Sequence, residues 1–271
     1  MASSLPPIQS ARLSTGKLSY RRSGETGRPV LMLMHGIGGH SGSWFKQYAC
    51  FSKYFDVLAW DAPGSGQSDP LRLSSPAATH YSEAGLELLE RLKIKVVYLL
   101  GHSLGGLIAS ACAAAPGSPV KGLILADTSI GHARLSAQDR QSKLMARLLE
   151  GPDPDARQLD EKIQRLLGPD ASIEIKQAAR SILTQIYYPG YYQAARMLSA
   201  ADIHEFLPQV SVPSLVICGA QDKITPPETN IDVAIALRTA YQEIPGAGHL
   251  VYLERPDAFN QTVVSFFQSN D

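Results

Sequence analysis

The sequence has few cysteines and no long apolar run, and each absence excludes a class of protein. Its three cysteines, Cys50, Cys112 and Cys218, stand in apolar surroundings within a chain of 271 residues. Such an odd, sparse set excludes a disulfide framework and predicts reduced thiols in a cytoplasmic protein. No run approaches the roughly 20 apolar residues of a membrane-spanning helix, and residues 1–12 lack the apolar centre of a secretory signal. We therefore expect no membrane partner.

The chain also lacks net charge and a metal-ligand pattern. Lys plus Arg and Asp plus Glu both number 25, so the basic excess typical of nucleic-acid-binding proteins is missing, and no such partner is expected. His35 and His40 stand five positions apart in a glycine-rich loop, without Cys or Glu at ligand spacing, which predicts no metal site. No cofactor is expected either, and a small-molecule substrate is the partner that the sequence favours.

Short apolar runs alternate with helical patterns along most of the chain. The runs that predict buried strands are 30–34, 55–60, 96–100, 120–126, 214–218 and 240–244, and a weaker alternation predicts an early strand at 17–22. The segments that predict helices are 43–53, 79–92, 107–115, 227–237 and 256–267. This alternation predicts an α/β protein with a doubly wound, mainly parallel sheet.

Between residues 130 and 207 the pattern changes, because no convincing strand occurs there. Helical segments are expected at 136–150, 155–167, 172–187 and 191–200, with boundaries at Pro152, Pro154, Pro169 and Pro189. An insertion after the strand at 120–126 lies over the carboxyl edge of the sheet, where ligands bind. The chain is therefore predicted to comprise a core (1–129), a helical cap (130–207) and the second part of the core (208–271).

A G-x-S-x-G motif at residues 101–105 lies between a predicted strand and an Ala-rich helical segment. Gly101 and Gly105 leave room for a sharp turn that holds Ser103 in a strained backbone conformation. Such a turn presents the Ser103 hydroxyl as a nucleophile and directs the backbone N–H of Leu104 toward the group under attack. The alternative is a glycine-rich turn with an incidental serine.

A serine nucleophile needs a general base, and the base needs an orienting carboxylate. Of the seven histidines, His249 alone lies in a glycine-rich loop directly after a late strand. Asp222 follows the strand at 214–218 and is the favoured acid, while Asp127, at the end of the preceding strand, is the alternative. The chain order Ser103, Asp222, His249 is the one expected of a hydrolase of this architecture.

Two further groups complete the predicted site. The oxyanion of the reaction needs two N–H donors, for which we expect Leu104 and Ile37, and His35 is expected to brace the Ile37 loop. In the cap, Tyr188, Tyr192 and Arg196 are the candidate substrate-binding residues.

The motifs together resemble those of the α/β-hydrolase superfamily over the range from about Lys17 to Phe267. The matching segments are 35–39, 61–69, 101–106, 219–222 and 246–249. The segments at 190–213 and 254–260 resemble 3-oxoadipate enol-lactonase-like hydrolases, and meta-cleavage-product hydrolases share the same architecture. Serine as the nucleophile, where dehalogenases carry aspartate, argues against haloalkane chemistry.

The resemblance and the motifs lead to one expected function and two alternatives. We expect a cofactor-independent serine hydrolase of class EC 3.1.1 that cleaves a small carboxylic ester or lactone through an acyl-enzyme on Ser103. The first alternative is a C–C bond hydrolase of an aromatic ring meta-cleavage product. The second is a non-catalytic ligand-binding protein on a hydrolase fold, which would have no need of Ser103, Asp222 and His249 together.

Overall fold

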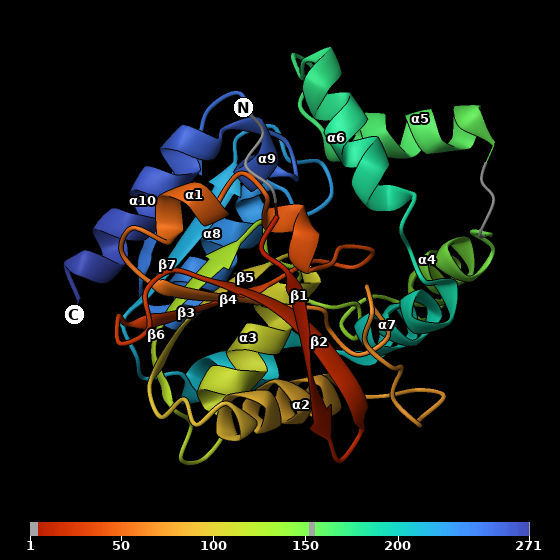
Figure 1. Ribbon diagram of the computed structural model, residues 1–271. Coiled ribbons are helices and arrows are strands. Elements are labelled where there is room, and N and C mark those ends of the chain that lie inside the picture. Colours follow the sequence, from red (N-terminus) through yellow and green to blue (C-terminus); the bar gives the residue numbers. More distant parts are fainter. Residues whose placement is uncertain (1–4, 152–154, 271) are drawn as a thin grey trace.

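The apolar runs of the sequence form one eight-stranded sheet (Figure 1). The computed structural model describes residues 5–151 and 155–270, so Pro152 and Pro154 lie outside it. The spatial order of the strands is β1-β2-β4-β3-β5-β6-β7-β8. Their bounds are β1 Ile8–Leu13, β2 Gly16–Ser23, β3 Val30–Met34, β4 Asp56–Trp60, β5 Val97–His102, β6 Val120–Ala126, β7 Ser214–Gly219 and β8 Ala240–Ile244.

Strands β3 to β8 run parallel, and β1 and β2 join one edge in antiparallel fashion. The chain passes from β3 outward to β4 and then returns across β3 to β5. This reversal makes a switch point between β3 and β5, where Met34 pairs with Gly101. Ligands bind at such points in open parallel sheets. The fold class predicted from the sequence is confirmed.

Helices cover both faces of the sheet, as a doubly wound fold requires. Met32 faces α2 (Ala78–Arg91), α3 (Leu104–Ala114) and α8 (Pro227–Leu237), whose apolar side chains belong to the same buried cluster. Leu31 and Leu33 point to the other face, which α9 (Val251–Glu254) and α10 (Pro256–Gln268) cover. The sheet is thus buried on both sides, which explains why its strands are continuous apolar runs.

Two predictions for the first third of the chain need correction. Strand β1 is not predicted, because it is an edge strand with mostly unburied side chains and therefore carries no apolar alternation. The helix expected at 43–53 is wrong in extent, since a 3₁₀ turn at Ser41–Trp44 precedes the short α1, Tyr48–Phe51. All four residues of that 3₁₀ turn are buried, whereas a helix at the surface would keep one face in water.

The insertion after β6 is helical. Its elements are α4 Ala137–Leu148, α5 Ala156–Leu166, α6 Ile173–Leu183 and α7 Tyr188–Ala200, followed by 3₁₀ turns at Ile203–Glu205 and Leu207–Gln209. Helix α4 packs on α7, and α5 packs on α6, to one side of the sheet (Figure 1). We call the described residues of 130–207 the cap. Its bounds as a separate unit stay a prediction.

The predicted bounds of the last two cap helices were displaced. Helix α6 ends at Leu183, four residues before the expected end, and α7 begins at Tyr188. Pro189 therefore lies in the first turn of α7, where its missing N–H has no intrahelical partner to lose. The proline begins a helix and does not separate two helices.

The two ends of the cap meet. Gly131 forms an isolated bridge with Asp202, and the N–H of Ile203 donates to the carbonyl of Ile130 at 2.9 Å. Arg134 adds an ion pair to Asp202 at 2.6 Å. The chain thus leaves the core and returns to it at one place. No helix among the described residues is both long and apolar enough to cross a membrane.

Candidate active site

Ser103 occupies the turn between β5 and α3, as the motif predicts. Its φ of 54° and ψ of −118° lie outside the regions that side chains favour. A Cβ on Gly101 would stand 2.4 Å from the carbonyl oxygen of Gly105, and one on Gly105 would stand 2.1 Å from that of Met34. Only glycine therefore fits at both positions, and the helix begins pressed against the end of β3.

The three predicted catalytic side chains lie in a single hydrogen-bonded relay. Nε2 of His249 is 3.1 Å from the Oγ of Ser103, and its Nδ1 is 2.8 Å from Oδ2 of Asp222. All three side chains are buried. Because a carboxylate can only accept, Nδ1 carries the proton, which leaves Nε2 free to accept the hydroxyl proton of Ser103.

Asp222 is held as a carboxylate by its surroundings. Burial alone would raise its pKa, but the hydrogen bonds from His249, Thr225 and Ile224 lower that pKa below the ordinary value. The Thr225 hydroxyl lies 2.7 Å from Oδ2 of Asp222, and the N–H of Ile224 donates to Oδ1 at 2.7 Å. Each oxygen is thus anchored, so the imidazole of His249 has a fixed orientation.

Asp127, the alternative acid, has a different position. Its Oδ1 accepts the N–H of Gly219 at 2.8 Å, and its Oδ2 accepts that of Val251 at 3.4 Å. Burial and the charge of Asp222 raise the pKa of Asp127 well above its ordinary value. The side chain ties the end of β7 to the start of α9, and no hydrogen bond joins it to the ring of His249 in the described residues.

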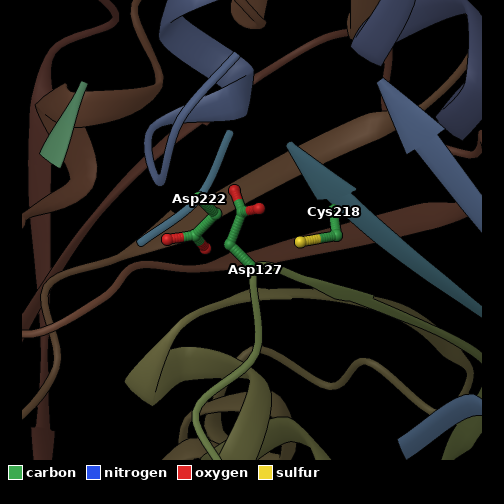
Figure 2. Close-up of side chains that lie close together, drawn as sticks. All are labelled: Asp127, Cys218 and Asp222. Atoms are coloured by element: carbon green, nitrogen blue, oxygen red, sulfur yellow. The ribbon is translucent and has the colours of Figure 1, made fainter. Parts of the chain in front are cut away.

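Figure 2 shows Asp127 and Asp222 beside Cys218, a group whose ligand atoms lie within 4.8 Å of one another. The carboxylate oxygens already accept backbone or side-chain hydrogen bonds. The Cys218 thiol lies 3.4 Å from the carbonyl of Gly219, and burial raises its pKa. A metal ion here would need that thiol deprotonated and the relay to His249 broken. The donor set does not suit a metal.

The loop after β3 provides the second predicted oxyanion donor. A Cβ on Gly36 would stand 3.0 Å from the Cβ of Ser103, so this loop lies directly against the nucleophile. The Ile37 N–H makes no backbone hydrogen bond within the described residues. Leu104 is the first residue of α3, so its N–H has no intrahelical partner. Ile37 and Leu104 line one small hollow together.

His35 braces this loop. Its Nε2 accepts the N–H of Ala62 at 3.0 Å, so Nδ1 carries the proton and donates to the carbonyl of Gly36 at 2.8 Å. Burial lowers the pKa of His35 to about 4. The ring is therefore neutral at neutral pH and serves to fix the loop that presents Ile37.

His102, the neighbour of the nucleophile, holds the loop of the base. Its Nε2 donates to the carbonyl of His249 at 2.7 Å. Burial, reinforced by the proximity of His249, lowers the pKa of His102 to about 3. The neutral ring thus fixes the backbone of His249, a role that the motif alone does not indicate.

A cavity of about 340 Å³ opens above Ser103 between the sheet edge and the cap. From the core it is lined by Gly36, Ile37, His102, Ser103, Ser129, Lys223, Ile224, Thr225, His249, Leu250 and Tyr252. From the cap it is lined by His132, Lys143, Ala146, Arg147, Glu150, Lys162, Arg165, Leu166, Ala179, Ile182, Leu183, Tyr191 and Leu198. Its volume suits a small ligand.

The candidate substrate-binding residues of the cap need correction, because Tyr188, Tyr192 and Arg196 do not line this cavity. The Tyr192 hydroxyl donates to the carbonyl of Glu150 at 2.6 Å, and Tyr188 lines a separate hollow beside α5. The residue that enters the lining is Tyr191. Tyr188 and Tyr192 stand four residues apart and so share one face of α7, whereas Tyr191 lies on a neighbouring face.

Sequence reasoning also missed several residues of the site. Thr225 and the basic side chains of the lining belong to no motif, and Glu254 appears only as the first residue of a segment that resembles enol-lactonase-like hydrolases. The sequence held one signal for Thr225: it follows Asp222 by three residues, and an Asp side chain in a turn commonly accepts hydrogen bonds from the residues just after it.

Comparison with known proteins places the chain in a family. Residues 29–256 match the family model of the alpha/beta hydrolase fold. The 3-oxoadipate enol-lactonase 2 of Acinetobacter baylyi is 27% identical over 91% of each chain. A pimeloyl-[acyl-carrier protein] methyl ester esterase of Yersinia enterocolitica is 27% identical, over 89% of this chain and 94% of its own.

A solved structure agrees with this assignment. The enol-lactonase from Burkholderia xenovorans LB400 superposes with a TM-score of 0.85 and 28% identity, covering 96% of this chain and all of the other. The sheet order, the turn at Ser103 and the match over residues 29–256 lead to the same conclusion. The chain belongs to the alpha/beta hydrolase fold family, and it is a hydrolase.

Proposed function

We propose that the protein is a serine hydrolase that cleaves a small carboxylic ester or lactone through an acyl-enzyme on Ser103. The observation that carries the proposal is the relay from Ser103 through His249 to Asp222, located at the floor of a ligand-sized cavity. A protein that only binds a ligand has no need of such a relay.

The first half-reaction follows from the hydrogen-bond directions. Ser103 Oγ attacks the substrate carbonyl while Nε2 of His249 takes its proton, and Asp222 stabilises the resulting imidazolium. The N–H groups of Ile37 and Leu104 donate to the oxyanion. His249 then gives the proton to the departing alcohol oxygen as the C–O bond breaks. The acyl group stays on Ser103.

The second half-reaction releases the acid. A water molecule gives a proton to His249 and attacks the acyl carbon, and the proton then returns to Oγ as the bond to Ser103 breaks. In a lactone the alcohol oxygen remains attached to the acyl group, so the product is one hydroxy acid, or its keto tautomer when the lactone is an enol lactone. No step needs a cofactor.

Two further observations support this choice of substrate class. The relatives described above include an enol-lactonase and a methyl ester esterase, and the cavity volume of about 340 Å³ fits a compact acyl group. A cytoplasmic location stays a prediction from the sparse cysteines.

The test is covalent labelling together with a substrate panel. A fluorophosphonate probe should label Ser103, and Ser103→Ala should abolish labelling and lower kcat by roughly 10⁶-fold while the thermal midpoint stays unchanged. The panel contains p-nitrophenyl esters of graded length, lactones and a ring-cleavage dienoate. Turnover of the dienoate alone would favour C–C hydrolysis, and turnover that persists in Ser103→Ala would overturn the proposal.

A further inference from the structure

Basic side chains gather on the lining of the cavity. Among the described residues that line it, five are Lys or Arg, namely Lys143, Arg147, Lys162, Arg165 and Lys223, and one, Glu150, is acidic. The chain as a whole has no net charge. The positive charge is therefore concentrated at the site and is not a general property of the surface.

One of the five charges is already neutralised. Lys162 lies 2.5 Å from the carboxylate of Glu150, which also accepts the Tyr191 hydroxyl at 2.9 Å. We call Lys143, Arg147, Arg165 and Lys223 the cationic rim. None of the four has an ion-pair partner in the described parts of the chain.

Arg147 is the member of the cationic rim with the most confined surroundings. It is half-buried, and its charge acts on both His132 and Tyr191, two other residues of the lining. Burial, together with the charges of Arg147 and Lys143, lowers the pKa of His132 to about 4. His132 is thus neutral at neutral pH and offers no competing charge.

We propose that the substrate carries an anionic group, a carboxylate in the simplest case, that binds the cationic rim while its ester or lactone carbonyl meets Ser103. The proposal rests on the proposed function. Like charges that face one partly enclosed cavity repel each other, and an anion between them removes that repulsion. Arg147 and Arg165 can also bond both oxygens of a carboxylate.

The test compares substrates that differ in one charge. Monomethyl adipate and methyl hexanoate present the same methyl ester, and only the first ends in a carboxylate. We expect kcat/KM to be at least about tenfold higher for monomethyl adipate, from one charge-assisted hydrogen bond. Added NaCl should shrink the ratio. Arg147→Gln should remove most of the preference by lowering kcat/KM for monomethyl adipate far more than for methyl hexanoate. Lys176→Gln, on the exposed side of α6, is the matched control and should leave the preference as it is.

A binding measurement separates this proposal from the proposed function. Adipate should bind Ser103→Ala protein in calorimetry, and the additional change Arg147→Gln should weaken that binding about tenfold. Equal turnover of the two esters, with no adipate binding, would overturn the anionic substrate and leave the serine hydrolase intact. Adipate binding without turnover of any ester would support the anionic ligand and overturn the serine hydrolase.

A different observation concerns a buried carboxylate next to the base. Glu254 is 3% exposed, and its two oxygens accept the N–H of Gly248 at 2.9 Å and that of Gly168 at 2.8 Å. Gly248 precedes His249, while Gly168 lies in the cap between α5 and α6. One side chain therefore joins the loop of the base to the cap.

The two loops are in direct backbone contact. The N–H of His249 donates to the carbonyl of Leu166 at 2.8 Å. A Cβ on Gly248 would stand 2.5 Å from the nitrogen of Gly168. Burial raises the pKa of Glu254, and the two N–H groups oppose that rise. No cation pairs with its carboxylate in the described residues, so the two amides are its main stabilising partners.

The geometry assigns Glu254 as a positioning residue for His249, one that makes the α5–α6 loop part of the support of the base. Glu254→Gln keeps one acceptor but turns an amide NH₂ toward the other N–H. We expect it to lower kcat about tenfold with little change in KM, and Glu254→Ala to lower kcat further. The matched control is Glu228→Gln on the exposed side of α8.

The readout must separate positioning from stability. Hydrogen exchange should accelerate at the amides of Gly168, Gly248 and His249 in Glu254→Gln, and the rate of fluorophosphonate labelling should fall in step with kcat. A lowered thermal midpoint with unchanged kcat and labelling rate would overturn the assignment and leave Glu254 a structural residue only.

Discussion

The floor of the cavity, formed by core residues around Ser103, and its roof, formed by the cap, are built in different ways. On the floor, Ser103, Asp222 and His249 are all buried, and backbone groups fix the turn or carboxylate of each one. In the roof, helix α4 has no buried residue at all, yet it contributes Lys143 and Arg147 to the lining. The side chains proposed to react are therefore held rigidly, whereas the side chains proposed to select the substrate lie on a helix with no buried residue.

The largest effect should come from the floor. Asp222→Asn leaves the shape of the site intact but offers an NH₂ group to His249 Nδ1, which favours the wrong tautomer. We expect kcat to fall by roughly 10³–10⁴-fold, measured with any ester that the wild type hydrolyses. Asp127→Asn is the control and should change kcat far less, since Asp127 does not bond the ring. A reversal of the two effects would show that the acid is misassigned.

The roof should set an upper limit on substrate length. The cavity of about 340 Å³ is small for a long acyl chain. We expect p-nitrophenyl esters with acyl chains beyond about eight carbons to have kcat/KM at least about tenfold below that of the butanoate. Rapid cleavage of a dodecanoate would contradict a closed roof.

Two neighbouring tyrosines offer a sharper test of the roof. The hydroxyls of Tyr191 and Tyr192 both bond Glu150, but only Tyr191 lines the cavity. Each change to Phe should cost about 1 kcal/mol of unfolding free energy. Only Tyr191→Phe should alter the ratio of kcat/KM between two esters of different length, by a few fold. An equal change of that kcat/KM ratio in Tyr192→Phe would show that Tyr191 is not the tyrosine that contacts the substrate.

The smallest effect concerns stability of the floor as pH changes. The pKa of Asp127 is raised in the folded protein, so folding binds a proton that the unfolded chain releases above about pH 4. Wild-type stability should therefore decline as pH rises from about 4 toward the raised pKa. Asp127→Asn has no proton to bind at this position. Its unfolding free energy relative to wild type should therefore increase over the same pH window, as urea titrations at pH 5 and pH 8 would show.

The sequence predicts the turn at Ser103 and the parallel strands because each is specified by residues close together along the chain. The turn at Ser103 needs glycine two positions before and two after it, and that requirement is legible as a motif. The parallel strands are buried on both faces, so they stand out as apolar runs. Strand β1 lacks such burial and was missed for that reason.

The roof resists prediction because its residues converge from separate elements. Lys143 and Arg165 lie on α4 and α5 of the cap, and Lys223 joins them from the loop after β7 in the core. Which tyrosine of α7 faces the cavity depends on how that helix packs against α4, which no local pattern records. Glu254 stands in the sequence as the first residue of a segment that resembles enol-lactonase-like hydrolases, but that resemblance gives no sign that its carboxylate lies between two loops.

The bridge between Gly131 and Asp202 brings the two ends of the cap together, and this bears on how the cap can change in evolution. A segment whose two ends adjoin can be exchanged, shortened or replaced without stretching the rest of the chain. New specificities can then arise by replacing the roof as a cassette, while the sheet and its turn are passed on unchanged. The limit on such exchange lies at Gly64 and Gly190, since a Cβ on Gly190 would stand 1.8 Å from the carbonyl oxygen of Gly64. A successful cassette must keep a glycine where it meets that loop.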